Sequence, residues 1–177
     1  MDSLKKDLRK KFRISRSHQI PSREWRLLID SPEFEGASVI ASYASYDHEP
    51  DTTSLNATIL QRGKTLLLPK LNDDRSLAWI EWDGRPELLS RHHKLFEPIG
   101  APFDGEIDLV IIPALAVDLH GYRLGQGGGS YDRALINMKA WKVALINDEE
   151  LSETPLPAEY FDQPVNAVVT PTRIVRF

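Results

Sequence analysis

The sequence predicts an α/β fold, a three-layer α/β/α sandwich with a largely parallel, Rossmann-like central sheet. Short apolar runs alternate along the chain with helix-like or turn-like segments, as in proteins whose parallel strands are joined by helices. Runs such as residues 109–112 (LVII) and 143–146 (VALI) are apolar on both faces, as expected of strands that helices cover on both sides. The predicted strands are residues 38–44, 64–71, 77–82, 108–117, 142–147 and 166–170.

The helices are predicted from apolar spacing and from proline. Residues 2–16 form one helix, because three apolar side chains recur at every fourth position: Leu4, Leu8 and Phe12. A second helix follows residues 20–22 (IPS), since proline is favourable near a helix start, and its inward side chains are Trp25, Leu28 and Ile29. Further helices fit residues 53–61 and the segment that follows Ser130.

Length and composition bound the class of protein. The chain has 177 residues, enough for one domain with a full core, so residues 1–177 are expected to form a single domain. The absence of cysteine excludes disulfides, thiolate zinc sites and a cysteine nucleophile, and the five histidines show no metal-ligand spacing. The N-terminus lacks an apolar signal region, and no apolar run reaches the roughly 18 residues of a membrane span. We therefore expect a cytoplasmic protein.

Charge is distributed unevenly along the chain. Residues 1–26 contain nine Lys or Arg and three Asp or Glu, a net charge of +6, whereas the remainder has thirteen against twenty-three, or −10. Nucleic acid is not the expected partner, because the basic arm lacks interleaved aromatic side chains and the acidic body repels phosphates. The simplest interpretation of the arm is a solvated helix face. Alternatively, the helix at about residues 2–16 packs back on the body and brings positive charge to an anionic ligand.

Residues 125–135 (GQGGGSYDRAL) are the segment most suggestive of ligand binding. Four of the five positions 125–129 are glycine, and the loop follows a predicted strand and precedes a predicted helix. Ligands gather at the carboxyl ends of strands in open α/β sheets, where glycine lets backbone N–H groups approach phosphate oxygens. Arg123 can clamp phosphate and Asp132 can hold Mg²⁺, so the segment suits a nucleoside triphosphate. It matches no standard phosphate-loop pattern, and a tight or mobile surface loop is the alternative.

A second candidate segment is residues 42–55, where a predicted strand ends before a predicted helix. Glu49 and Asp51 in this segment can accept hydrogen bonds from the N–H groups of a heterocyclic ligand. Capping of the helix by Asp51, Thr52 or Thr53 explains the same residues without a ligand.

Taken in order, these segments resemble the 5-formyltetrahydrofolate cyclo-ligase family, also called methenyltetrahydrofolate synthetase. The most specific mark is residues 121–133 (GYRLGQGGGSYDR), similar to the family pattern G-x-R-L-G-x-G-x-G-[YF]-Y-D-r. The weaker marks occur in the family's order, and the resemblance covers nearly the whole chain. They are residues 5–9 (KKDLR), Tyr43 with 49–52 (EPDT), 68–69 (LP), 96–98 (FEP), 108–113 (DLVIIP), 156–157 (LP), Asp162, Val165 and 168–170 (VVT).

The resemblance implies ATP- and Mg²⁺-dependent closure of 5-formyltetrahydrofolate to 5,10-methenyltetrahydrofolate through phosphorylation of the formyl oxygen. Arg123 and Tyr131 are expected in catalysis, and Asp132 and Asp162 are expected to hold Mg²⁺. The residues expected to bind ATP are Lys5, Lys6, Asp7, Leu8, Arg9, Arg123, Leu124, Gly125, Gln126, Gly127, Gly128, Gly129, Ser130 and Tyr131. Those expected to bind folate are Tyr46, Glu49, Asp51, Gln126, Gly127, Gly128, Gly129 and Ser130. The implied partner is a reduced folate, bound by a monomer without nucleic-acid or membrane partners.

The chain departs from the family pattern near the expected ligands. Ser130 stands where the family has Tyr or Phe, and Phe161 where it has His. Further departures are Ala114, Val117, Asn166 and Pro171. One alternative is therefore a family member that binds folate or nucleotide without turnover, or that acts on a different folate-like substrate. A nucleic-acid binder that uses the basic arm is the remaining hypothesis.

Overall fold

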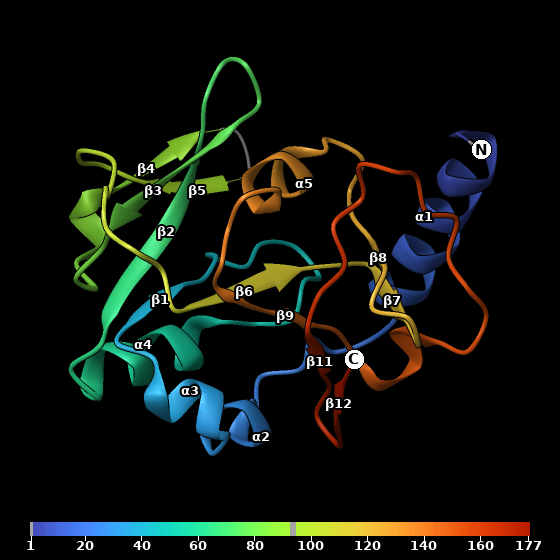
Figure 1. Ribbon diagram of the computed structural model, residues 1–177, viewed down its shortest axis with the longest axis horizontal. Helices are drawn as coiled ribbons and strands as arrows, with labels where there is room; N and C mark the ends of the chain where they lie inside the picture. Colours follow the sequence, from blue (N-terminus) through green and yellow to red (C-terminus); the bar gives the residue numbers. More distant parts are fainter. Residues whose placement is uncertain (1, 93–94) are drawn as a thin grey trace.

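The structure of the protein, a computed structural model, describes residues 2–92 and 95–177 (Figure 1). Its centre is a seven-stranded sheet in the order β12-β11-β9-β6-β1-β2-β3. The five inner strands are parallel, and the edge strands β3 and β12 run antiparallel to their neighbours, so the predicted largely parallel sheet is confirmed. The strands are β1 (Val39–Ala41), β2 (Thr65–Leu71), β3 (Leu77–Glu81), β6 (Leu109–Pro113), β9 (Trp141–Leu145), β11 (Ala167–Val169) and β12 (Ile174–Arg176).

The order of the parallel strands determines where a ligand site can form. From β1 the chain first moves to β2 on one side, and β6, β9 and β11 then follow on the other side of β1. The strand order therefore reverses between β1 and β6. In doubly wound sheets ligands bind at this point, outside the carboxyl ends of the strands. The positions just beyond Ala41 and Pro113 are thus the expected place for a site.

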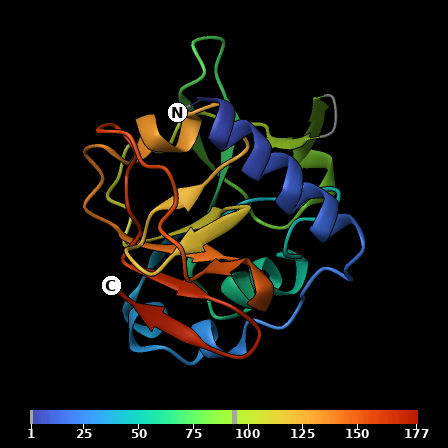
Figure 2. The same cartoon turned by 90° about the vertical axis from the view of Figure 1, so that its right-hand side faces the viewer.

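Helices lie on both faces of the sheet, which confirms the three-layer prediction (Figures 1 and 2). Three helices cover one face and one short helix covers the other, where loops complete the layer. The first three are α2 (Arg26–Ile29), α3 (Pro32–Gly36) and α4 (Thr53–Gln61), and the fourth is α5 (Ser130–Leu135).

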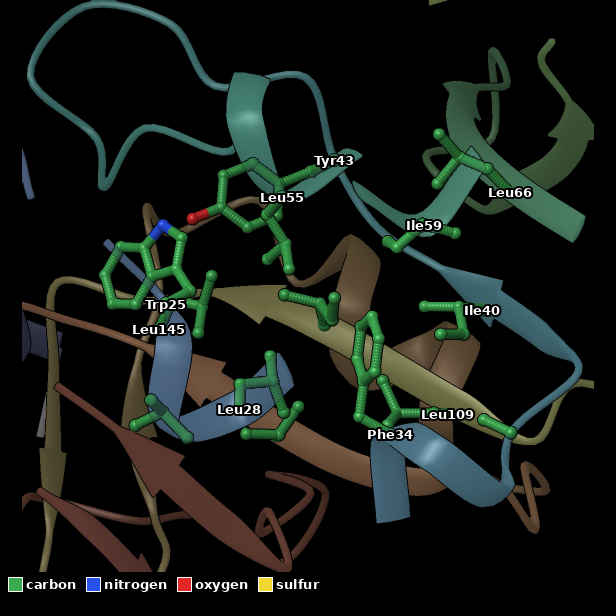
Figure 3. Close-up of a cluster of buried hydrophobic side chains, with 14 of the residues drawn as sticks. Trp25, Leu28, Phe34, Ile40, Tyr43, Leu55, Ile59, Leu66, Leu109 and Leu145 are labelled. Carbon is green, nitrogen blue, oxygen red and sulfur yellow. The ribbon is translucent and has the colours of Figure 1, made fainter. Parts of the chain in front are cut away.

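Alternation along the strands gives each face its own core. On β6, Leu109 and Ile111 belong to one core and Val110 and Ile112 to the other, because successive side chains of a strand point to opposite faces. Figure 3 shows the first core, in which helix residues meet sheet residues. The labelled helix-side residues there are Trp25, Leu28, Phe34, Leu55 and Ile59, and all are buried.

The N-terminal helix α1 (Asp2–Ser17) packs beside a small sheet at one end of the central sheet (Figure 1). Leu8 and Phe12 pack against a buried cluster that contains Leu115 and Leu124, whereas Leu4 is 55% exposed and does not join the predicted stripe. No helix in the described part of the chain is long and apolar enough to cross a membrane. The remaining elements are β4 (Leu89–His92), β5 (Leu95–Pro98), β7 (Ala116–Asp118), β8 (Arg123–Leu124), β10 (Leu151–Ser152) and the 3₁₀ helices η1 (Pro86–Leu88) and η2 (Asp148–Glu150).

Two of the predicted elements differ in the structure. The predicted second helix is the short α2, and a separate helix that was not predicted, α3, follows it, because Ser31 accepts a hydrogen bond from the Phe34 N–H as an N-cap and Pro32 starts a new helix. The predicted strand 108–117 becomes β6 and β7, which lie in different sheets. Beyond β6, the Leu115 N–H bonds to the Leu124 carbonyl, so the chain leaves the central sheet. Helix α4, by contrast, has the predicted bounds.

A buried ion pair anchors α1 to the rest of the protein. The Arg16 guanidinium donates to both carboxylate oxygens of Glu150, at 2.6 and 2.5 Å, and to the Ala114 carbonyl at 2.7 Å. Arg16 is 4% exposed and Glu150 is 2% exposed. Removal of one partner leaves the other charge buried without compensation, which is strongly destabilising.

We therefore expect Arg16→Met to lower the free energy of unfolding by about 3 kcal/mol or more. Urea denaturation at neutral pH measures this loss. The matched control is Arg26→Met, which breaks an ion pair with Asp30 whose side chains are 90% and 58% exposed. A change of less than ~0.5 kcal/mol is expected for the control. Equal changes in the two variants would show that the Arg16 pair does not stabilise the fold.

Candidate functional site

A cavity of about 540 Å³ lies at the point where the strand order reverses. Tyr43 and Ala44, which follow β1, and Pro113, which ends β6, form part of its wall. The other walls come from α1, β2, β3, β5, the glycine loop at 124–129 and the segment 159–162. The volume lies within the range of small-molecule sites, about 300 to 1,000 Å³.

The glycine loop at 124–129 joins β8 to α5 along one wall. Gly127 and Gly129 have φ angles of 104° and 67°, a region that side chains rarely adopt. A Cβ atom at Gly127 would lie 3.3 Å from the Arg9 guanidinium carbon, and one at Gly129 would lie 3.1 Å from an Arg133 nitrogen. Glycine is therefore required here both by the backbone and by two arginines that pack on it.

Helix α1 closes over the outside of this loop. The Arg9 Nε atom donates to the Gly125 carbonyl at 3.0 Å, and Arg13 donates to the Gln126 carbonyl and side-chain oxygen. Lys5 and Arg9, four residues apart on one helix face, both line the cavity. The basic arm thus lies against the glycine loop, as the folded-back interpretation of its charge requires.

Arg123 and Asp132 form an ion pair that joins the two ends of the loop. The Arg123 Nη2 atom donates to Asp132 Oδ1 at 2.6 Å, and the Arg123 side chain is 4% exposed. Burial lowers the pKa of Arg123, and Asp132 and the neighbouring Tyr131 partly offset this effect. The Arg123 Nε atom is buried and has no hydrogen-bond partner among the described residues. Protein acceptors therefore do not saturate this guanidinium.

The segment 159–163 brings a second acidic group to the same end of the cavity. The Lys5 Nζ atom lies 2.7 Å from Asp162 Oδ2 and 3.0 Å from Glu159 Oε1. Burial opposes the charge on Lys5, but Asp162 and Glu159 outweigh it and raise the pKa of Lys5. The Gln163 N–H donates to Asp132 Oδ1 at 3.1 Å, which ties this segment to the start of α5.

Asp132 and Asp162 fit Mg²⁺ only together with other oxygen ligands. Each uses one carboxylate oxygen in its hydrogen bonds to described residues, so the second oxygen is available. Across residues 2–92 and 95–177 no three His, Cys, Asp or Glu side chains group as a metal site, and His93 lies outside these residues. Mg²⁺ is commonly bound by one or two carboxylates with substrate phosphates and water, which matches this arrangement.

The rest of the cavity wall is largely apolar but includes two buried carboxyl groups. Glu49 and Glu97 are each 7% exposed. The Tyr46 N–H donates to Glu49 at 3.3 Å, and the Leu71 N–H donates to Glu97 at 3.1 Å. The apolar end of the cavity is formed by Pro69, Leu71, Leu77, Leu95 and Phe96 beside Glu97, whereas Glu49 follows β1 and is influenced by the Arg16 charge of α1. This end suits a planar heterocycle that carries hydrogen-bonding groups.

Burial raises the pKa of Glu49 to about 7, because the Tyr46 N–H and the Arg16 charge stabilise the carboxylate only in part. The group thus exchanges its proton near neutral pH and can either donate or accept a hydrogen bond. Between the usual pKa of 4.5 and 7, the native state holds a proton that the unfolded state has released. The free energy of unfolding therefore falls as the pH rises through this window, by about 3 kcal/mol in total.

We expect Glu49→Gln to remove most of this fall, since the amide does not titrate. Urea denaturation at pH 5 and pH 8 should show the wild type losing more stability between the two pH values than the variant. Glu24→Gln, at an exposed glutamate, is the matched control and should keep the wild-type difference. Identical pH dependence in the wild type and Glu49→Gln would contradict the raised pKa.

Four of the residues expected at the site lie outside the cavity wall. Lys6 and Asp7 are exposed on the outer side of α1, and Leu8 packs in the apolar cluster under the helix. Asp51 accepts a hydrogen bond from the Thr53 N–H at 2.8 Å at the start of α4. Its Thr53 contacts, with the nearby Arg23 charge, outweigh burial and lower the pKa of Asp51. The helix-capping alternative thus describes the observed contacts of Asp51.

The remaining expected residues are brought together at the cavity, and the structure adds others that the sequence did not assign to a ligand. The expected ones are Lys5, Arg9, Tyr46, Glu49, Arg123, Leu124, Gly125, Gln126, Gly127, Gly128, Gly129, Ser130, Tyr131, Asp132 and Asp162. The additions with polar or aromatic groups are Tyr43, Phe96, Glu97, Glu159 and Phe161. Glu97 lies in β5, a strand that is not among the predicted ones. An acidic residue within an apolar run was the one sign in the sequence that Glu97 could belong to a site. Nothing in the sequence, however, indicated that this run lies beside the glycine loop.

Comparisons with known proteins agree with this fold. The profile of the 5-formyltetrahydrofolate cyclo-ligase family matches residues 2–171. A 5-formyltetrahydrofolate cyclo-ligase of Escherichia coli K12 is 35% identical over 156 residues, which cover 83% of this chain and 85% of that protein. A 5-formyltetrahydrofolate cyclo-ligase from Mycolicibacterium smegmatis is 36% identical over 146 residues, which cover 76% of this chain and 74% of that protein. The NMR structure of 5,10-methenyltetrahydrofolate synthetase from Aquifex aeolicus matches with a TM-score of 0.81 at 31% identity and covers 98% of this chain and 92% of that one.

Proposed function

Because the chain belongs to the 5-formyltetrahydrofolate cyclo-ligase family of enzymes, we propose that it converts 5-formyltetrahydrofolate and ATP to 5,10-methenyltetrahydrofolate, ADP and phosphate. One observation carries the proposal: a single cavity has a cationic end with a glycine loop, an apolar end, and the buried Glu49 carboxyl group in its wall. Arginine and backbone N–H groups suit a triphosphate, and an apolar wall with few polar groups suits a pterin. A reaction between the two ligands requires both in one cavity.

Phosphorylation solves the chemical difficulty that the formyl oxygen is a poor leaving group. The formyl oxygen attacks the γ-phosphorus of ATP, the bond to the β–γ bridging oxygen breaks, and ADP leaves. N10 of the folate then attacks the formyl carbon, the carbon–oxygen bond breaks, phosphate leaves with the electron pair, and N10 loses its proton to solvent. No protein nucleophile is needed, so positioning and charge neutralisation account for the catalysis.

The cationic end performs the neutralisation. Arg123 stabilises the charge on the transferred phosphoryl group, while Lys5 and Arg9 approach the phosphate chain from α1. The backbone of 125–129 supplies N–H donors. The centre of the Tyr131 ring lies 6.0 Å from the guanidinium carbon of Arg123. Because burial raises the pKa of Tyr131, its hydroxyl stays a neutral donor at physiological pH.

Asp132 and Asp162 are the residues that would hold Mg²⁺, together with phosphate oxygens. When bound, the ion supplies Lewis-acid charge to the phosphoryl oxygens. The chain fixes both carboxylates in advance, through Arg123 and the Gln163 N–H on Asp132 and through Lys5 on Asp162.

The apolar end orients the folate. Glu49, with a pKa of about 7, pairs with N–H or carbonyl groups of the pterin, and the Tyr46 backbone fixes its position. Ser130 lines the cavity at the start of α5, between the two ends. The glycine loop thus contacts both ligands where the phosphoryl group is transferred.

The test of this function is a turnover assay. Protein, ATP, Mg²⁺ and 5-formyltetrahydrofolate are mixed, and the absorbance of methenyltetrahydrofolate is recorded, with omission of ATP or of Mg²⁺ as controls. Product that depends on both supports the proposal. A folded chain that binds ATP by calorimetry but forms no product would overturn it.

A second candidate function rests on Ser130. This small side chain lies in the cavity wall at a position where the family pattern has Tyr or Phe, which leaves more room beside the folate. The candidate is a binding protein without turnover, or an enzyme for a different folate-like substrate. Calorimetry that detects folate binding together with an absence of turnover would favour it, and Ser130→Phe should then restore turnover.

A further inference from the structure

Two aromatic side chains lie in solvent at the edge of the cavity. Tyr160 is 98% exposed and Phe161 is 43% exposed, and their rings pack edge to face with centroids 5.0 Å apart. Phe161 also belongs to the cavity wall. Aromatic rings contribute most when they are buried, so an adjacent pair left in water beside a binding cavity indicates a contact surface for a ligand.

Hydrogen bonds and a cation hold this pair in place. Asp162, the next residue, accepts hydrogen bonds from the Glu159 N–H at 2.8 Å and from Lys5 Nζ at 2.7 Å. The same Lys5 Nζ atom lies 5.9 Å from the centre of the Phe161 ring. Because the segment is fixed before a ligand arrives, little conformational entropy is lost when a ring stacks on it.

The position of Phe161 in the cavity distinguishes between the two planar groups of the proposed reaction. Phe161 lies at the cationic end with Lys5, whereas the residues of the apolar end of the cavity wall come from β2, β3 and β5. In Figure 1 these strands and the segment 153–163 (orange-red) lie on opposite sides of α5. A triphosphate that lies along the glycine loop would point its γ-phosphate toward the folate. Its nucleoside end would then lie toward Phe161.

We propose that Phe161, supported by Tyr160, is the platform on which the base of the nucleotide stacks. The inference rests on the proposed function, since it takes ATP as the ligand of the cationic end. The triphosphate is then bound by charge and the base by stacking on an aromatic face, a contact that typically contributes a factor of about ten or more to affinity.

The test separates the base from the phosphates. ATP affinity is measured by calorimetry and as a KM, and inorganic tripolyphosphate with Mg²⁺ serves as a ligand that has phosphates but no base. For Phe161→Leu we expect the Kd and KM for ATP to rise about tenfold and the inhibition constant of tripolyphosphate to stay within about twofold. Phe161→Trp should retain the affinity for ATP. Phe177→Leu, at a phenylalanine that is 42% exposed and outside the cavity wall, is the matched control.

Three other outcomes would contradict the proposal that the base stacks on Phe161. Unchanged ATP affinity in Phe161→Leu would overturn it. An equal loss of ATP and tripolyphosphate affinity would show that Phe161 acts only through Lys5 and Asp162. A raised KM for folate alone would assign the ring to the other ligand, the effect we expect instead from Phe96→Leu. If the wild type binds ATP without turnover, the proposed reaction fails, but the calorimetric comparison still decides the role of Phe161.

Discussion

Replacing Arg123 with methionine is expected to lower kcat/KM for ATP by about 10³-fold or more, the largest effect of any single change in the cavity. The side chain is 4% exposed, and its Nε atom has no partner in the part of the chain that the structure describes, so its charge acts in a desolvated setting where an interaction with phosphate is strong. Turnover assays at saturating folate measure the loss. The kcat/KM of Arg123→Lys should lie between those of the wild type and Arg123→Met, since lysine keeps the charge but cannot make the bidentate hydrogen bonds of arginine.

Two controls separate catalysis from folding in this experiment. Arg123→Met also leaves Asp132 without its partner, so urea denaturation must show that the variant is folded at the assay temperature. Added guanidinium should then restore part of the rate by occupying the vacated space. Arg173→Met, at an exposed arginine outside the cavity wall, should leave turnover unchanged. A folded Arg123→Met protein with the wild-type rate would remove Arg123 from the mechanism.

Asp132→Asn is expected to lower kcat by about 10² to 10³-fold and to weaken Mg²⁺-dependent ATP binding, while folate binding stays within about twofold. Asparagine keeps an oxygen that accepts from Arg123 and the Gln163 N–H, so the fold of the loop is preserved while the negative charge is lost. Calorimetry with each ligand and a titration of Mg²⁺ in the turnover assay check the prediction. Equal loss of ATP and folate binding would contradict the assignment of Asp132 to the metal.

The sheet could be predicted because its strands are short, continuous apolar runs. Residues 109–112 and 143–146 are buried on both faces, and their sequences contain no alternating polar residues that would obscure the apolar pattern. The pairing of β4 and β5 could not be predicted, since its sequence includes Arg91, His92 and Glu97 and has no glycine between the two strands. The break after Pro113 was also invisible, because its cause is a hydrogen bond to Leu124, a residue of another strand.

The glycine loop and its flanking charges could be predicted as one site because they lie within ten residues of each other. Lys5 and Asp162 are 157 residues apart, and only the fold brings them to 2.7 Å. Asp51 shows the opposite problem, since its position after a strand is equally typical of a ligand contact and of a helix cap. Local sequence cannot distinguish these, because both use the same carboxylate oxygens as acceptors.

The docking of α1 has a consequence for how the protein is made. Arg9, Arg16 and Lys5 bond to partners that lie 116, 134 and 157 positions later in the chain. At a synthesis rate of 5 to 20 residues per second, the last of these partners follows Lys5 by roughly 8 to 30 s. Until these partners are synthesised, α1 also lacks the surface that buries Leu8 and Phe12, which includes Leu115, Leu124 and Leu156. Contacts of such long range form late in folding, so the cationic end of the cavity, where we propose that ATP binds, is completed last.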